Sequence, residues 1–147
     1  MKLNLLQLTY IVIVVALIGF TDATYLTIKH YRNEVPPCSI VAGCETVIAS
    51  KYSVILGIPV ALLGSLYYLS IIILSVSYLD TKNAKILTLL GRATWIGLFG
   101  SIYFVSLQLF VIKALCIYCI VSAGSSFTLF GLSFPLLKSI KNINSAF

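Results

Sequence analysis

The sequence predicts an all-α integral membrane protein, a four-transmembrane-helix bundle with one long cysteine-bearing loop between the first and second helices. Two observations carry this prediction. The 147 residues are 60% hydrophobic and have a mean hydropathy of +1.07, which is more apolar surface than a water-soluble domain of this size can hide. Four apolar segments, each long enough for the roughly 20 residues of a membrane-crossing helix, account for most of that surface.

The expected spans lie at 5–28, 52–79, 86–112 and 114–137. The first span follows Lys2 as a signal peptide would, but its apolar run exceeds the usual core of about 7–15 residues, so we interpret it as a retained helix. The only long connection is 29–51, and the other turns are short. We therefore expect a single membrane domain over 1–147.

The charged residues fit a membrane protein better than a nucleic-acid binder. The net charge is +6, but the basic residues are scattered singly at segment ends, where they anchor helices to lipid headgroups. Asp22 and Arg92 are the only charges inside the expected spans. Arg92 is close enough to its span's start to snorkel, and we interpret Asp22 as a rim residue in preference to a proton relay.

All four cysteines are expected on one side of the membrane. With four spans, the loop that holds Cys38 and Cys44 faces the same side as the start of the last span, which holds Cys116 and Cys119. The positive charges slightly favour the side opposite the cysteines as the cytoplasmic one. Thiols outside the cytoplasm can be oxidised, so the cysteine pairs favour the same orientation. We expect a multi-pass protein of the cytoplasmic (inner) membrane, with both termini cytoplasmic and the cysteines extracytoplasmic.

The cysteines are spaced as two pairs. Cys116 and Cys119 lie three residues apart on one helix face, and the unpaired N–H groups of a first helical turn would stabilise a Cys116 thiolate. Cys38 and Cys44 enclose only "SIVAG", a loop short enough to close a disulfide. Buried apolar cysteines, a structural disulfide and a zinc site are the alternatives. A loop pair and a lipid-facing helix pair fit a tetrahedral site poorly, so we expect no metal.

One pair in water and one at the lipid boundary together indicate a relay by thiol–disulfide exchange. The loop pair would exchange with a soluble protein and then with the helix pair. The helix pair would then need a two-electron acceptor that dissolves in the membrane. The sequence shows no flavin or haem signature, and a lipid-soluble quinone (ubiquinone, menaquinone or a related compound) meets the requirement.

Three stretches resemble the vitamin K epoxide reductase family in its bacterial single-domain form. They are, in chain order, "PPCSIVAGCETVIAS", "YSVILGIPVALLGSLYY" and "CIYC". The resemblance implies a four-helix bundle around a quinone, capped by a loop that carries a short amphipathic helix. It also implies a membrane thiol:quinone oxidoreductase that reoxidises a thioredoxin-like protein and so supports disulfide formation in exported proteins.

The resemblance further implies a role for each cysteine. Cys119 would lie beside the quinone ring, and Cys116 would be its partner, attacked by a loop cysteine. Cys38 and Cys44 would be the shuttle pair, and which of them attacks Cys116 stays open. The implied quinone-pocket residues are Ser50, Ser53, Leu56 and Ala123.

Two departures from the family pattern refine these expectations. Animal members have a tyrosine where this chain has Ala123, which favours plain quinone reduction over reduction of vitamin K epoxide. Many bacterial members carry a fused thioredoxin-like domain, whereas this chain stops at Phe147. We therefore expect the partner to be a separate thioredoxin-like (DsbA-like) protein.

Other functions and roles remain open from the sequence. A small transporter or channel with structural cysteines and a metal-handling membrane protein are the alternatives of other classes. A carrier that reduces outside proteins is the alternative within the same class, because spacing does not reveal reduction potentials. Tyr67, Tyr68, Tyr103 and Tyr118 are candidates for the quinone site, although bundle packing or the interfacial belt is the expected role for most of them.

Overall fold

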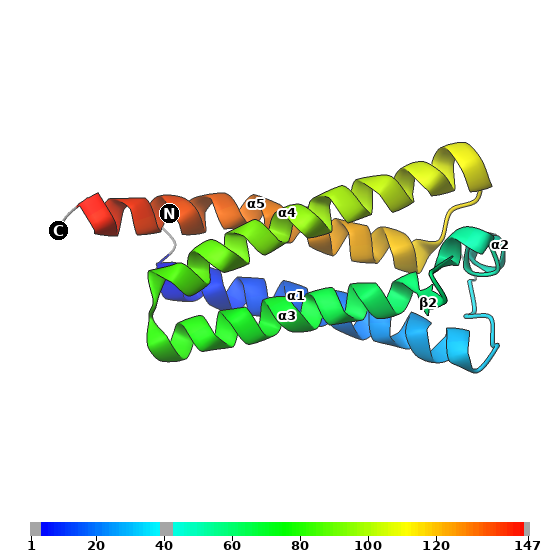
Figure 1. The fold of residues 1–147 in the computed structure, drawn as a ribbon, viewed down its shortest axis with the longest axis horizontal. Helices are drawn as coiled ribbons and strands as arrows, with labels where there is room; N and C mark the ends of the chain where they lie inside the picture. Colours follow the sequence, from blue (N-terminus) through cyan, green and yellow to red (C-terminus); the bar gives the residue numbers. More distant parts are fainter. Residues whose placement is uncertain (1–3, 39–42, 146–147) are drawn as a thin grey trace.

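The structure, a computed structural model, describes residues 4–38 and 43–145. Four long helices run side by side as a bundle: α1 (Leu5–Tyr31), α3 (Val60–Thr81), α4 (Ala84–Ser106) and α5 (Ile117–Ser145) (Figure 1). Each is long and apolar enough to cross a membrane, α4 together with the turn that extends it to Ile112. The prediction of an all-α bundle with four membrane spans is confirmed.

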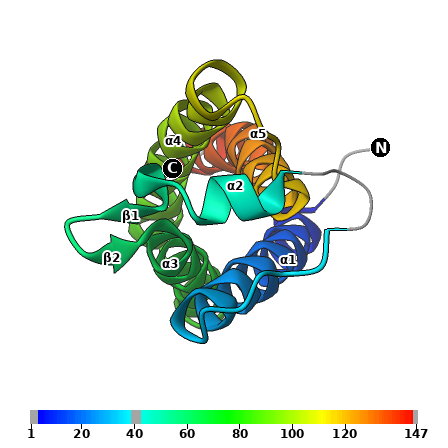
Figure 2. The same cartoon turned by 90° about the vertical axis from the view of Figure 1, so that its right-hand side faces the viewer.

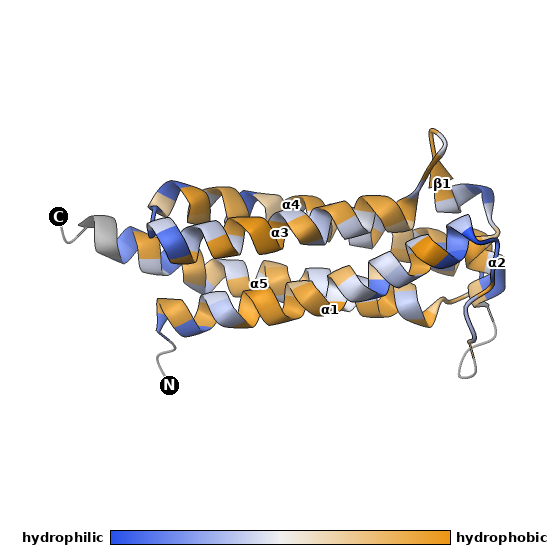
Figure 3. Cartoon of the chain, turned by 90° about the horizontal axis from the view of Figure 1, so that it is seen from below, coloured by the Kyte–Doolittle hydropathy of each residue, from blue (hydrophilic) through white to orange (hydrophobic). Residues whose placement is uncertain are grey.

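The helices form a ring in which each contacts two neighbours. Helix α1 packs against α3 and α5, and α4 packs against the same two helices. The end-on view shows this square arrangement, with α2 (Cys44–Ile48) lying across one end (Figure 2). Apolar residues cover most of the helix length and hydrophilic residues gather toward the two ends (Figure 3). This pattern is the one expected of a bundle whose solvent is lipid.

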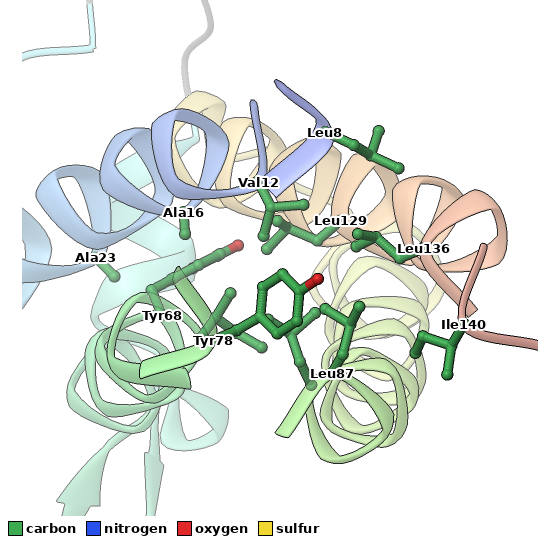
Figure 4. Close-up of a cluster of buried hydrophobic side chains, with 12 residues drawn as sticks. Leu8, Val12, Ala16, Ala23, Tyr68, Tyr78, Leu87, Leu129, Leu136 and Ile140 are labelled. Atoms are coloured by element: carbon green, nitrogen blue, oxygen red, sulfur yellow. The ribbon is translucent and has the colours of Figure 1, made fainter. Parts of the chain in front are cut away.

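The tightly packed core fills the half of the bundle that is remote from the cysteine loop. Its largest fully buried apolar side chains include Tyr68, Leu87, Leu129 and Leu136 (Figure 4). Many hydroxyl side chains within the spans bond to carbonyls of their own helix, as Thr9 does to Leu5 at 2.9 Å, because lipid offers them no partner. The other half of the bundle is less completely filled, and there the structure places its cavity.

The second span begins later than expected, at Val60 and not at residue 52. The intervening residues form the turn η1 (Lys51–Ser53) and a hairpin of β1 (Val54–Ile55) and β2 (Ile58–Pro59). Leu56 and Gly57 have φ angles of 51° and 81°, as the two central residues of a tight hairpin turn require. A helix from residue 52 would hold both a glycine and a proline in its interior, and each destabilises a helix there.

The other span boundaries shift by smaller amounts. Helix α1 continues to Tyr31, beyond the expected end at residue 28. Helix α4 passes without a break into a π-helical turn, η2 (Leu107–Ile112), and α5 begins at Ile117, three residues later than the expected 114. These changes leave the order of spans and loops as predicted.

Candidate redox site

The loop cysteines form a disulfide in the cap over the bundle. Cys38 and Cys44 are bonded, with their Cα atoms 6.2 Å apart. Residues 39–42 of the enclosed stretch lie outside the described residues. Cys44, the first residue of α2, is fully buried, whereas Cys38 is half-buried. The two sulfurs of the loop pair therefore differ in how readily another protein could reach them.

The second pair lies directly beneath the first. Cys116 is fully buried in one cluster with Cys44 and Val47, and Cys38 and Cys119 pack against that cluster. Cys116 and Cys119 are free thiols. The fold therefore brings both pairs to one end of the bundle, as the parity of the spans predicts.

Gln108 fixes the backbone that presents Cys116. Its side-chain Oε1 accepts a hydrogen bond from the Cys116 N–H at 3.0 Å, and its carbonyl accepts one from the Ala114 N–H at 3.2 Å. The chain can reverse here because Lys113 adopts a left-handed conformation, with φ of 54°. Gln108 is only 3% exposed, and it lies in η2, a π-helical turn of the kind that often marks functional sites.

Cys116 occupies the start of α5, where negative charge is stabilised. Its carbonyl accepts the Ile120 N–H at 3.0 Å, which places Cys116 at the position that precedes the first helical turn. A hydrogen bond from the Cys119 thiol lowers the pKa of Cys116 to about 7, and this effect outweighs burial, which raises the pKa. A Cys116 thiolate is therefore well populated near neutral pH.

Tyr118 and Gly43 are the residues through which the loop and the start of α5 approach each other. The Tyr118 ring packs on the Tyr25 ring with centroids 5.5 Å apart, and its hydroxyl donates to the Pro37 carbonyl at 3.3 Å. Gly43 directly precedes Cys44, and a Cβ at this position would lie 2.9 Å from the Leu115 carbonyl oxygen. Glycine thus permits the close approach between the loop and the residues that lead into Cys116.

A cavity of about 370 Å³ opens below α2, between the helices. Cys119 is part of its wall, whereas Cys116 is buried behind it. Val47 and Ile48 of α2 line the end nearest the cap. The volume falls within the range of small-molecule sites, and the wall is mostly apolar, as such sites usually are. One thiol of the pair therefore faces a space that could hold an apolar ligand.

Comparison with known proteins agrees with this geometry. Residues 10–134 match the vitamin K epoxide reductase family. The chain belongs to this family. It is also 30% identical, over 128 residues, to the thiol-disulfide oxidoreductase LTO1 of Arabidopsis thaliana. That match covers 82% of this chain and 33% of the relative, so the chain spans about a third of the length of that curated protein. The family resemblance stated from the sequence is confirmed, and the four long apolar helices make the chain a multi-pass membrane protein.

The cavity is lined by most of the residues that the resemblance to the vitamin K epoxide reductase family implies for the quinone pocket. Ser50, Ser53 and Ala123 are in its wall. Ser50 and Ser53 use their hydroxyls locally, donating to the carbonyls of Val47 and Ser50 at 2.7 and 2.8 Å. Leu56 does not line the cavity. It is 98% exposed at the tip of the hairpin, because the turn that delays the second span also carries this side chain away from the bundle.

The family fold also places polar residues in the wall that sequence reasoning discounted or missed. Tyr68 donates its hydroxyl hydrogen to the carbonyl of Ser122, and the hydroxyls of Ser122 and Ser126 lie 3.3 and 2.9 Å from its oxygen. Ser122 and Ser126 follow Cys119 at helical spacing, a signal that was available in the sequence. Gln108 and Tyr67 are further polar residues of the wall.

Asp22 is half-buried, and one of its carboxyl oxygens lies inside the bundle. It lies more than two turns before the end of α1, and its Oδ2 atom is buried without a hydrogen-bond partner in the described part of the chain. It is close enough to the cysteine pair for its charge to act on Cys116, whose pKa it raises. The carboxyl group therefore belongs to the electrostatic surroundings of the redox site.

Proposed function

We propose that the protein is a membrane thiol:quinone oxidoreductase that passes electrons from a thioredoxin-like protein, through two cysteine pairs, to a quinone. One observation carries the proposal: the helix pair packs against the loop pair and also contributes to the wall of the cavity. Cys116 shares a buried cluster with Cys44, and Cys119 lines the cavity wall. The name of the Arabidopsis relative, a thiol-disulfide oxidoreductase, supports the same class of reaction.

Burial supports an order for the two loop sulfurs. Because Cys38 is half-buried and Cys44 is fully buried, Cys38 is the sulfur that a thiolate of the partner attacks. A mixed disulfide with Cys38 forms and Cys44 leaves as a thiolate. The partner's second thiol then attacks the mixed disulfide, so that the partner is oxidised to its disulfide and both loop cysteines are reduced.

The next exchange is between the two pairs of the chain itself. The Cys44 thiolate attacks Cys116 of an oxidised Cys116–Cys119 pair, and Cys119 leaves as a thiolate. Cys38 then attacks Cys44, which restores the loop disulfide and releases Cys116 as the thiolate. Two electrons move from the loop to the helix pair. A loop disulfide above two free helix thiols, the arrangement of this structure, is the product of that step.

The residues of the cavity fit a quinone. The wall of this space of about 370 Å³ is mostly apolar, and it includes Cys119 and Tyr67, whose buried hydroxyl has no partner in the described part of the chain. A bound quinone would supply an acceptor for two electrons and two protons. Cys119 presents its sulfur to that space, Ser50, Ser53 and Ala123 form part of the wall, and α2 shields the cap end from water. As the helix pair gives up two electrons and two protons, Cys119 and Cys116 form their disulfide again.

The proposal includes an orientation and a cellular role. We place the cap on the extracytoplasmic side of the cytoplasmic (inner) membrane, with the opposite end of the bundle, where α1 begins and α5 ends (Figure 1), in the cytoplasm. The electron donor is a separate thioredoxin-like (DsbA-like) protein that has become reduced by oxidising its substrates. The net result is disulfide formation in exported proteins.

The test is quinol formation by the purified protein in detergent, with decylubiquinone as acceptor and either a reduced DsbA-like protein or dithiothreitol as donor. We expect Cys116→Ala and Cys119→Ala to abolish the reaction with both donors. Cys38→Ala should abolish it with the protein donor and retain it with dithiothreitol. Ser70→Ala, at an exposed serine of α3, is the control and should keep wild-type rates. If the wild type forms no quinol with either donor, or if the helix variants remain active, the proposal is wrong.

A further inference from the structure

One residue of the cavity wall has a buried hydroxyl group with unused hydrogen-bonding capacity. Among the described residues, three buried side-chain oxygens have no hydrogen-bond partner, and they belong to Asp22, Thr24 and Tyr67. Of these three residues, only Tyr67 lines the cavity. A buried hydroxyl that lacks a partner destabilises the folded protein, because it has lost its bonds to water without replacement. The position therefore favours a ligand that can accept a hydrogen bond.

The surroundings of Tyr67 hold its hydroxyl between α3 and α4. Its ring packs edge-on against the ring of Tyr68, with centroids 5.1 Å apart and an interplanar angle of 65°. Its outer end lies over Gly97 of α4, where an added Cβ would overlap the Tyr67 hydroxyl and lie 2.9 Å from Cε1. Gly97 is thus the residue that leaves room for the hydroxyl. The hydroxyl of its neighbour Tyr68 already has hydrogen-bond partners in Ser122 and Ser126.

We propose that the Tyr67 hydroxyl donates a hydrogen bond to a carbonyl oxygen of the quinone in this cavity, and that Gly97 makes this position available. The inference rests on the proposed function, because it names a residue that binds the proposed acceptor. A quinone ring offers two carbonyl acceptors and no donor, so it complements a tyrosine O–H that has no other partner. In a wall that is mostly apolar, a directed donor of this kind fixes how the ring is oriented.

Tyr67→Phe is the direct test, because it removes the hydroxyl and keeps the ring. We would measure decylubiquinone binding to the purified protein by calorimetry, and the carbonyl stretch of the bound quinone by infrared difference spectroscopy. We expect the Kd to rise about three- to tenfold, as for the loss of one neutral hydrogen bond. The carbonyl band should move to higher frequency. Tyr103→Phe, at a tyrosine that is 56% exposed and outside the cavity wall, should change neither quantity.

Gly97→Ala gives a second test that leaves the hydroxyl in the sequence. The added methyl group should displace the Tyr67 ring and weaken quinone binding at least as much as Tyr67→Phe does. Gly131→Ala is the matched control, since a Cβ there meets nothing within 4 Å. The melting temperature separates binding from structure: Tyr67→Phe removes an unpartnered hydroxyl, so stability should be unchanged or higher.

The results distinguish this inference from the proposed function. If wild type reduces decylubiquinone, while Tyr67→Phe shows wild-type affinity and an unshifted carbonyl band, the inference is wrong and the proposed function stands. Weaker binding that comes only with a lower melting temperature would assign Tyr67 a structural role and would also overturn the inference. A wild-type protein that neither binds nor reduces the quinone would refute the proposed function itself.

Discussion

Cys119 controls the reactivity of Cys116, and removing its thiol should make Cys116 much less acidic. The hydrogen bond from Cys119 is the largest influence on Cys116, and it lowers the pKa from an ordinary 9.0 to about 7. In Cys119→Ala this donor is lost while burial, which raises the pKa, remains. The pKa should therefore return to about 9 or higher. At pH 7 the thiolate fraction of Cys116 would fall from about one half to about one per cent.

The titration can be followed by thiolate absorbance in the ultraviolet, because the loop cysteines are in a disulfide and Cys116 is the single free thiol of the variant. Cys119→Ser is the matched control, since a serine hydroxyl can still donate to the Cys116 sulfur. It should keep the pKa of Cys116 well below that of the alanine variant. Equal pKa values in Cys119→Ala and Cys119→Ser would refute the reasoning and would assign the low pKa to the start of α5 alone.

Three further predictions concern the supports of the site. Gln108→Leu leaves the buried Cys116 N–H without its acceptor, so the melting temperature should fall by an amount equivalent to about 1–3 kcal/mol, whereas Gln108→Glu should retain most of the stability. Gly19→Ala would bring a methyl group into the buried ring of Tyr68, and thermal unfolding should show a loss of about 1–3 kcal/mol that Gly131→Ala does not show. Because the charge of Asp22 raises the pKa of Cys116, Asp22→Asn should move the thiolate titration to lower pH, and a titration that stays in place would contradict that electrostatic role.

The sequence by itself determined the class of fold and the side of the membrane that the cysteines share. Four long apolar segments suffice for this, because a helix satisfies its own backbone in lipid and its length is set by the bilayer. The parity of four spans then brings the loop holding Cys38 and the start of the last span to one end. The sequence also predicted that Cys116 and Cys119 form a pair, since helix geometry alone places residues at this spacing on one face.

Only the tertiary structure decided which side chains meet at that end. Gln108 reaches the Cys116 N–H because a π-helical turn and a left-handed Lys113 reverse the chain between them, and neither feature follows from hydropathy. Leu56 is excluded from the cavity by a hairpin turn that lies within an apolar stretch. The Tyr67 hydroxyl finds its space only because Gly97 on another helix faces it. Such contacts depend on the relative rotation of packed helices, which the period of a single helix does not determine.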